Sequence, residues 1–107
     1  MTLAQQTCIP CQGGTPMTEI AAEALLSELH GWSLTDGATW LHKHYTFPDF
    51  VRALAWVNCI GAVAEEQQHH PDMAVGWGYV TVRLQTHAMS GLHQSDFILA
   101  AKLDALT

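Results

Sequence analysis

The chain has few cations, few cysteines and no long apolar run. Lysine and arginine together number four among 107 residues, and the formal net charge is −6. Because direct nucleic-acid binding requires several phosphate-neutralising cations, we expect no direct contact with DNA or RNA. No apolar run approaches the roughly 20 residues of a membrane-spanning helix, and the first residues lack the basic and apolar regions of a signal peptide. We therefore expect a cytoplasmic protein that does not contact a membrane.

The three cysteines, Cys8, Cys11 and Cys59, are an odd number and do not indicate a disulfide framework. Cys8 and Cys11 form a C-x-x-C pattern, which alone supplies half of a four-ligand zinc site. A redox pair is an alternative, although no strand and helix flank the pattern. Residues 1–17 show no periodicity and little to bury. We predict a flexible tail over residues 1–17, carrying two thiols, and a single domain over residues 18–107.

Histidine is the residue type that the chain has in excess. Seven histidines stand against four lysines and arginines, in a chain that is 49% hydrophobic. Such a composition indicates a globular domain with one core. Imidazole titrates near neutral pH, so the excess favours proton transfer or metal binding. Four of the seven are interpreted as ordinary surface residues: His30, His42, His44 and His93.

Hydrophobic periodicity predicts three helices and four strands. The expected helices cover residues 19–30, 50–70 and 94–105, and the expected strands cover 32–34, 40–47, 72–77 and 79–86. Thr18 and Ser95 are the expected N-caps of the first and last helices. The fold class is therefore α+β with the order αββαββα, a four-stranded antiparallel sheet and helices packed on one face. The second helix is apolar around most of its girth, which suggests a partner subunit on the side away from the sheet.

The segment at the end of the long helix carries the densest group of candidate site residues. His69 and His70 stand side by side, and Pro71 should end the helix at His70. His87 follows the last strand, and regular strand alternation would place it on the polar face with Arg83 and Gln85. We predict that the three imidazoles converge on one small-molecule pocket.

Two acidic residues flank the histidine pair. Glu65 lies one turn before His69, and Asp72 lies two residues after His70, so each could orient an imidazole. Three imidazoles could supply a proton donor and a proton acceptor near pH 7. A zinc site with three histidines is an alternative, but adjacent residues at a helix end point in different directions. A purely structural role is a second alternative.

These residues resemble a known family. The H-H-P-D segment of His69 to Asp72 and the T-H-x-x-x-G-L segment of Thr86 to Leu92 together resemble the pterin-4a-carbinolamine dehydratases. Upstream segments are similar to that family too: Gly31-Trp32, Phe47-Pro48-Asp49-Phe50, and the C-x-x-C followed by Gly13-Gly14.

The resemblance implies a lyase that dehydrates 4a-hydroxytetrahydropterin to quinonoid dihydropterin, without metal or organic cofactor. It places the catalytic histidines at His69, His70 and His87. Supporting roles fall on Glu65, Trp32 and Asp96, and Asp96 could instead simply stabilise the last helix. The family further implies a homodimer or homotetramer and a link to aromatic amino-acid hydroxylases, whose pterin it recycles. The alternative function is an accessory binding module or dimerisation cofactor of a regulatory protein.

The chain departs from the family at two places. His93 stands where Thr or Ser often caps the last helix, which puts that cap in doubt. Gly76 and Gly78 surround Trp77 where a Tyr-Asn pair is common, which puts the rim of the pocket in doubt.

Overall fold

A computed structural model describes residues 1–10 and 13–107, so Cys11 of the C-x-x-C pattern lies outside the described residues. The elements follow in the order η1 (Leu3–Gln5), α1 (Glu19–Leu26), β1 (Ser33–Thr35), β2 (Trp40–Thr46), α2 (Phe50–Gln67), β3 (Asp72–Gly76), β4 (Tyr79–Leu84), η2 (His87–Met89) and α3 (Gln94–Asp104). The predicted αββαββα order is confirmed, with two short 3-10 turns added.

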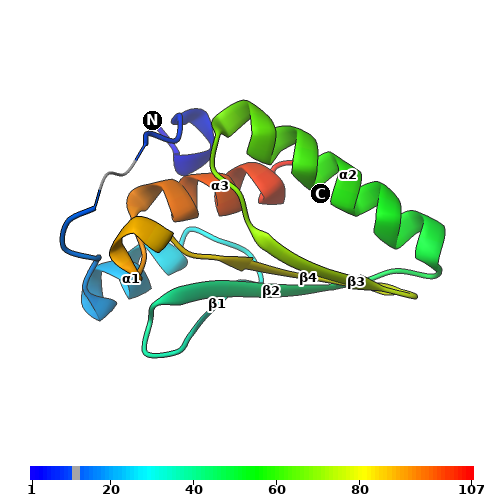
Figure 1. The fold of residues 1–107 in the computed structure, drawn as a ribbon, viewed down its shortest axis with the longest axis horizontal. Helices are drawn as coiled ribbons and strands as arrows, with labels where there is room; N and C mark the ends of the chain where they lie inside the picture. The colour runs from blue at the N-terminus through cyan, green and yellow to red at the C-terminus, as the bar shows by residue number, and fades with distance from the viewer. Residues whose placement is uncertain (11–12) are drawn as a thin grey trace.

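The four strands form one antiparallel sheet in the order β1-β2-β4-β3. The three helices lie together on one face of this sheet, and the other face is uncovered (Figure 1). The core fills the space between the two layers. From the sheet it takes fully buried Leu41, Val80, Val82 and Leu84, and from the helices Ala22, Ile60, Phe97, Leu99 and Leu103.

Strand alternation assigns the two faces as expected. Leu41 pairs with Leu84 and Tyr45 with Val80, and these side chains face the helices. His42 pairs with Arg83 and His44 with Thr81, so both histidines lie on the uncovered face.

The helix α1 ends at Leu26, four residues before its predicted end. The N–H groups of Glu28 and Leu29 bond three residues back, to Leu25 and Leu26, so the chain tightens into turns. Gly31 has a φ of +78°, a conformation that glycine adopts without strain, and it redirects the chain into β1. Thr18 caps the start as predicted, since its side chain accepts from the N–H of Ala21.

The predicted N-cap of α3 is wrong by two residues. His93, not Ser95, is the N-cap, and its Nδ1 accepts a hydrogen bond from the N–H of Ser95 at 3.1 Å. Asp96 completes a capping box, because its carboxylate accepts from the N–H of His93 at 2.9 Å. The His93 imidazole thus caps the helix in place of the Thr or Ser hydroxyl that is common at this position.

The expectation that residues 1–17 bury little is also wrong. Leu3 and Cys8 belong to the core, and the η1 turn packs on α3. The backbone carbonyl of Ala4 accepts a hydrogen bond from Lys102 at 2.8 Å. Met17 also packs against this core. These side chains are isolated in the sequence and follow no helical or strand period, so hydrophobic periodicity does not reveal them. Among the residues that the structure describes, no helix is long and apolar enough to cross a membrane.

Candidate active site

The three predicted histidines line one pocket. This histidine pocket has a volume of about 330 Å³ and lies where the end of α2, the end of β4 and the N-terminal segment meet. Its lining residues are Ile9, Pro10, Gln68, His69, His70, Gln85, Thr86, His87 and Ala88. Three separate parts of the chain therefore build it.

His69 is held by a buried carboxylate. Its Nε2 lies 2.6 Å from Oδ1 of Asp96, which is fully buried at the start of α3. The other oxygen, Oδ2, accepts from the hydroxyl of Thr86 at 2.8 Å and from the N–H of His93 at 2.9 Å. A buried carboxylate needs such donors, because an unpaired buried charge is costly. The Asp96 carboxylate therefore joins α3, the end of β4 and the His69 imidazole.

His70 pairs with a different acid. Its Nε2 lies 2.8 Å from Oε2 of Glu65, and both side chains are more than half exposed. The hydrogen bond from His70, aided by its charge, holds the pKa of the Glu65 carboxyl below its usual range. Glu65 is therefore an ionised partner for His70 at neutral pH.

The divergence of the two adjacent histidines comes from one residue. The α2 helix ends at Gln67, and Gln68 adopts the left-handed conformation with φ +52° and ψ +40°. The N–H of His69 then bonds back to the carbonyl of Ala64 at 3.1 Å. Because the chain turns here, His69 points toward α3 while His70 reaches back to Glu65. The predicted helix end at His70 is therefore three residues too late.

His87 reaches the pocket by a different route from the predicted one. The β4 strand ends at Leu84, and His87 opens the η2 turn, so regular alternation does not extend to it. An isolated bridge between Thr86 and Gly91 closes this loop. The imidazole packs edge-on against the Trp40 ring, with ring centroids 5.8 Å apart. Trp40 is in turn covered by the Arg83 guanidinium at 4.2 Å, so His87 adjoins the uncovered face of the sheet.

None of the four predicted supporting residues lines this pocket itself. Glu65 and Asp96 hydrogen-bond to histidines that line it, whereas Trp32 and Asp72 lie elsewhere. Trp32 is buried in the core, and its indole N–H donates to Asp104 at the far end of α3. Asp72 begins β3 opposite Arg83 and lines a separate hollow with it. Trp32 is therefore held at the opposite end of α3 from the histidine pocket, by a partner that the sequence pattern did not suggest.

Other lining residues were missed by sequence analysis. Thr86 donates to Asp96, and Gln85 donates to the carbonyl of Thr39 at 3.2 Å. Ile9 and Pro10 come from the segment that was assigned to a tail. The T-H motif contained the signal for Thr86, but nothing in the sequence indicated Ile9 or Pro10.

The N-terminal thiol is enclosed. Cys8 is buried, and burial, together with the nearby Asp96 carboxylate, raises the pKa of its thiol. Within residues 1–10 and 13–107, no cluster of three or more His, Cys, Asp or Glu side chains could hold a metal ion.

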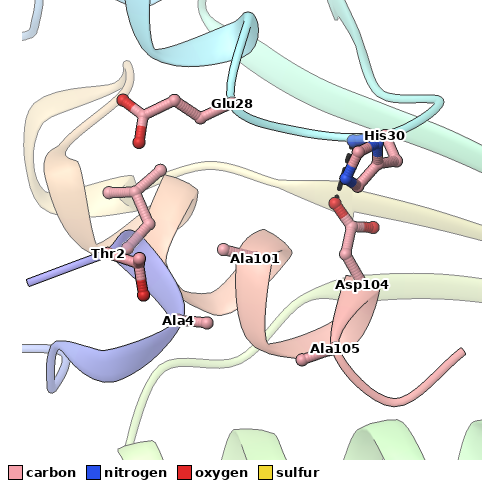
Figure 2. A pocket seen from close by; sticks show the side chains of 8 residues that line it. Thr2, Ala4, Glu28, His30, Ala101, Asp104 and Ala105 are labelled. Atoms are coloured by element: carbon pink, nitrogen blue, oxygen red, sulfur yellow. Dashed lines mark hydrogen bonds between the residues drawn. The ribbon is translucent and has the colours of Figure 1, made fainter.

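A second pocket lies at the other end of α3 (Figure 2). It has a volume of about 300 Å³, and its walls come from η1, the turn after α1 and the end of α3. Oδ2 of Asp104 accepts from the N–H of His30, while Oδ1 accepts from Trp32 and from Lys43. This carboxylate is therefore a structural anchor, and we place no function in this pocket.

Comparison with known proteins identifies the family. Residues 15–106 match the family described as pterin 4 alpha carbinolamine dehydratase. A protein of Halorhodospira halophila is 49% identical over 107 residues, covering 99% of this chain and 98% of its own. One of Methylococcus capsulatus is 45% identical over 106 residues, covering 98% and 93%. Both carry the name "Putative pterin-4-alpha-carbinolamine dehydratase". The chain belongs to the pterin-4a-carbinolamine dehydratase family.

Two solved structures share the fold. One, from Brucella melitensis, is titled a transcriptional coactivator/pterin dehydratase; its TM-score is 0.79 at 29% identity, covering 86% of this chain and 98% of its own. The other is titled a pterin dehydratase-like protein that is a RuBisCO assembly factor in the alpha-carboxysome. Its TM-score is 0.62 at 27% identity, covering 72% and 89%. The predicted α+β fold is confirmed by the first of these.

Proposed function

We propose that the chain is a hydro-lyase that dehydrates 4a-hydroxytetrahydropterin to quinonoid dihydropterin and water. The observation that carries the proposal is the shared pocket of His69, His70 and His87, two of which hydrogen-bond to separate carboxylates. Membership of the family supplies the substrate class.

The reaction needs one proton delivered and one removed. The C4a–O bond breaks, and an imidazolium protonates the hydroxyl so that it leaves as water. A neutral imidazole accepts the N5 proton, and the electrons of that N–H bond form the C4a=N5 double bond. General acid–base catalysis by positioned side chains suits these steps, since they form no covalent bond to the protein. The work is assigned jointly to His69, His70 and His87.

The Asp96 and Glu65 carboxylates determine which ring nitrogen of His69 and His70 can accept a proton. When the imidazole is neutral, a proton on Nε2 that is donated to a carboxylate leaves Nδ1 with its lone pair. Asp96 would impose this tautomer on His69, and Glu65 would impose it on His70. The Nδ1 atoms are then the proton acceptors offered to the pocket.

The function is tested by following the 4a-hydroxytetrahydropterin absorbance. Purified protein at micromolar concentration should accelerate its loss over buffer, with quinonoid dihydropterin as the product. If the absorbance is lost no faster with the protein than in buffer alone, the proposal is wrong.

We further propose that the product re-enters the pterin cycle of an aromatic amino-acid hydroxylase, in the cytoplasm.

The uncovered apolar surface of α2 and β3 supports a homo-oligomer. Phe50, Val51 and Leu54 on α2 are exposed, as are Met73 and Val75 on the edge strand β3. An edge strand beside exposed apolar side chains favours association, and we propose that a second copy of the chain covers this surface.

Sedimentation equilibrium tests the oligomer. The wild type should be a dimer or tetramer at micromolar concentration, whereas Leu54→Glu should shift the mass toward the monomer. Ile20→Glu, at an exposed site on α1, is the matched control and should leave the mass unchanged. A monomeric wild type would contradict the proposal, and would favour an accessory partner of another kind on this surface.

A further inference from the structure

Cys8 and Ile9 of the N-terminal segment bind residues at the end of α2 and the start of α3, next to His69 and its partner Asp96 in sequence. Cys8 donates its backbone N–H to Oε1 of Gln67 at 2.9 Å, and Gln67 is the last residue of α2. The hydroxyl of Ser95 accepts from the N–H of Ile9 at 3.1 Å and donates to the carbonyl of Ile9 at 3.2 Å. The Cys8 thiol donates to the carbonyl of Ser95 at 3.4 Å. Four hydrogen bonds therefore fix two residues.

The two residues that bind the segment, Gln67 and Ser95, are close in sequence to His69 and to its partner Asp96. Gln67 precedes His69 by two residues, and Ser95 directly precedes Asp96, the buried partner of His69. Ser95 is almost fully buried, with 1% of its surface exposed, so its hydroxyl has little access to competing water. The position of Ile9 is therefore coupled to the same two helix ends that position the imidazole.

Beyond its anchors, the segment presents apolar surface. Ile9 and Pro10 line the histidine pocket, and 60% of the Ile9 surface is exposed. An exposed isoleucine is unremarkable alone, but its backbone is pinned by hydrogen bonds on both its N–H and its carbonyl. These residues precede residue 15, where the match to the family begins.

We propose that Ile9 and Pro10 form a substrate-contacting wall of the histidine pocket, and that Ser95 is the positioning residue that holds this wall in place. The proposal rests on the proposed dehydratase function and adds a binding element to it. The imidazoles handle the protons, whereas the wall supplies apolar contact to the bound pterin. Such contact is made equally before and during the reaction, so it should affect KM more than kcat.

Steady-state kinetics of three variants tests the wall. Ile9→Ala and Ser95→Ala should each raise KM by about three- to tenfold and leave kcat within about twofold of wild type. The double variant should be no worse than the more impaired single variant, because both changes remove the same contact. Ile20→Ala, an exposed isoleucine on α1, is the matched control and should leave KM unchanged. An unchanged KM in Ile9→Ala, or a fall in kcat alone, would overturn the wall.

A binding measurement separates this proposal from the function itself. In the wild type, adding 7,8-dihydrobiopterin should shift the backbone amide resonances of Ile9 and His87 together, whether or not turnover is observed. A shift at His87 with none at Ile9 would refute the wall while leaving the dehydratase intact. A wild type without turnover, but with both shifts, would refute the dehydratase while keeping the wall.

Discussion

Replacing Asp96 by alanine is expected to lower the free energy of unfolding by about 3–5 kcal/mol, as measured by urea denaturation. The carboxylate is fully buried and accepts from three donors: the His69 imidazole, the Thr86 hydroxyl and the N–H of His93. Alanine would leave all three donors without this acceptor, including the buried Thr86 hydroxyl, and would break the capping box of α3. A loss of less than about 1 kcal/mol would contradict the view that Asp96 joins these elements.

The Asp96→Asn variant tests the role of the carboxylate in positioning His69. The amide is close in shape but cannot accept from all three donors, so we expect a kcat about 100-fold lower with a protein that still folds. Asp104→Asn is the matched control, because that carboxylate also accepts from three donors but lies at the other end of α3. It should lose stability and keep its kcat within about twofold. An equal loss of kcat in both variants would mean that the effect of Asp96 is only structural.

Alanine at each of the three pocket histidines is expected to lower kcat by about 10²–10⁴-fold. Each imidazole is a candidate proton donor or acceptor, and no other titratable side chain lines the pocket in the described part of the chain. The loss should be largest where the remaining imidazoles cannot take over the missing proton transfer. Steady-state kinetics of His69→Ala, His70→Ala and His87→Ala measure it.

The chain offers matched controls for these three variants. His42 and His44 lie on the uncovered face of the sheet, outside the histidine pocket, and both should tolerate alanine with kcat within about twofold. If His44→Ala impaired turnover as strongly as His70→Ala, the catalytic assignment to the pocket would be wrong.

The fold could be predicted because its signals are periodic. Val80, Val82 and Leu84 alternate with polar residues, and that alternation alone assigns the core face of β4. The apolar run of residues 50–64 indicates the α2 helix, and Asp49 indicates its start. The Asp49 side chain caps the helix by accepting a hydrogen bond from the N–H of Arg52. Local patterns therefore sufficed for element type, order and sheet face.

The site could be predicted only in part, because its geometry depends on single residues. That Gln68 would adopt a left-handed conformation was not visible in the sequence, yet it separates His69 from His70. The partner of His69 is Asp96, which lies 27 residues away, and spacing alone does not reveal such a contact. Ile9 is hydrogen-bonded at the pocket by Ser95, which lies 86 residues away. Long-range contacts made by one side chain carry no periodic signal.

The fold alone does not decide the activity. A relative of the same fold is titled an assembly factor for RuBisCO, whereas another is titled a coactivator and dehydratase. Function therefore has to be argued from the site. In this chain the site retains three imidazoles in one pocket, with carboxylates beside two of them.

One comparison tests the central claim most directly. The rate of 4a-hydroxytetrahydropterin loss is measured with wild type and with the variant in which His69, His70 and His87 are all alanine, at equal concentration and with circular dichroism confirming that both fold. We predict that the wild type accelerates the loss and that the triple variant proceeds at the rate of buffer. A folded triple variant as fast as wild type would show that these imidazoles do not handle the protons.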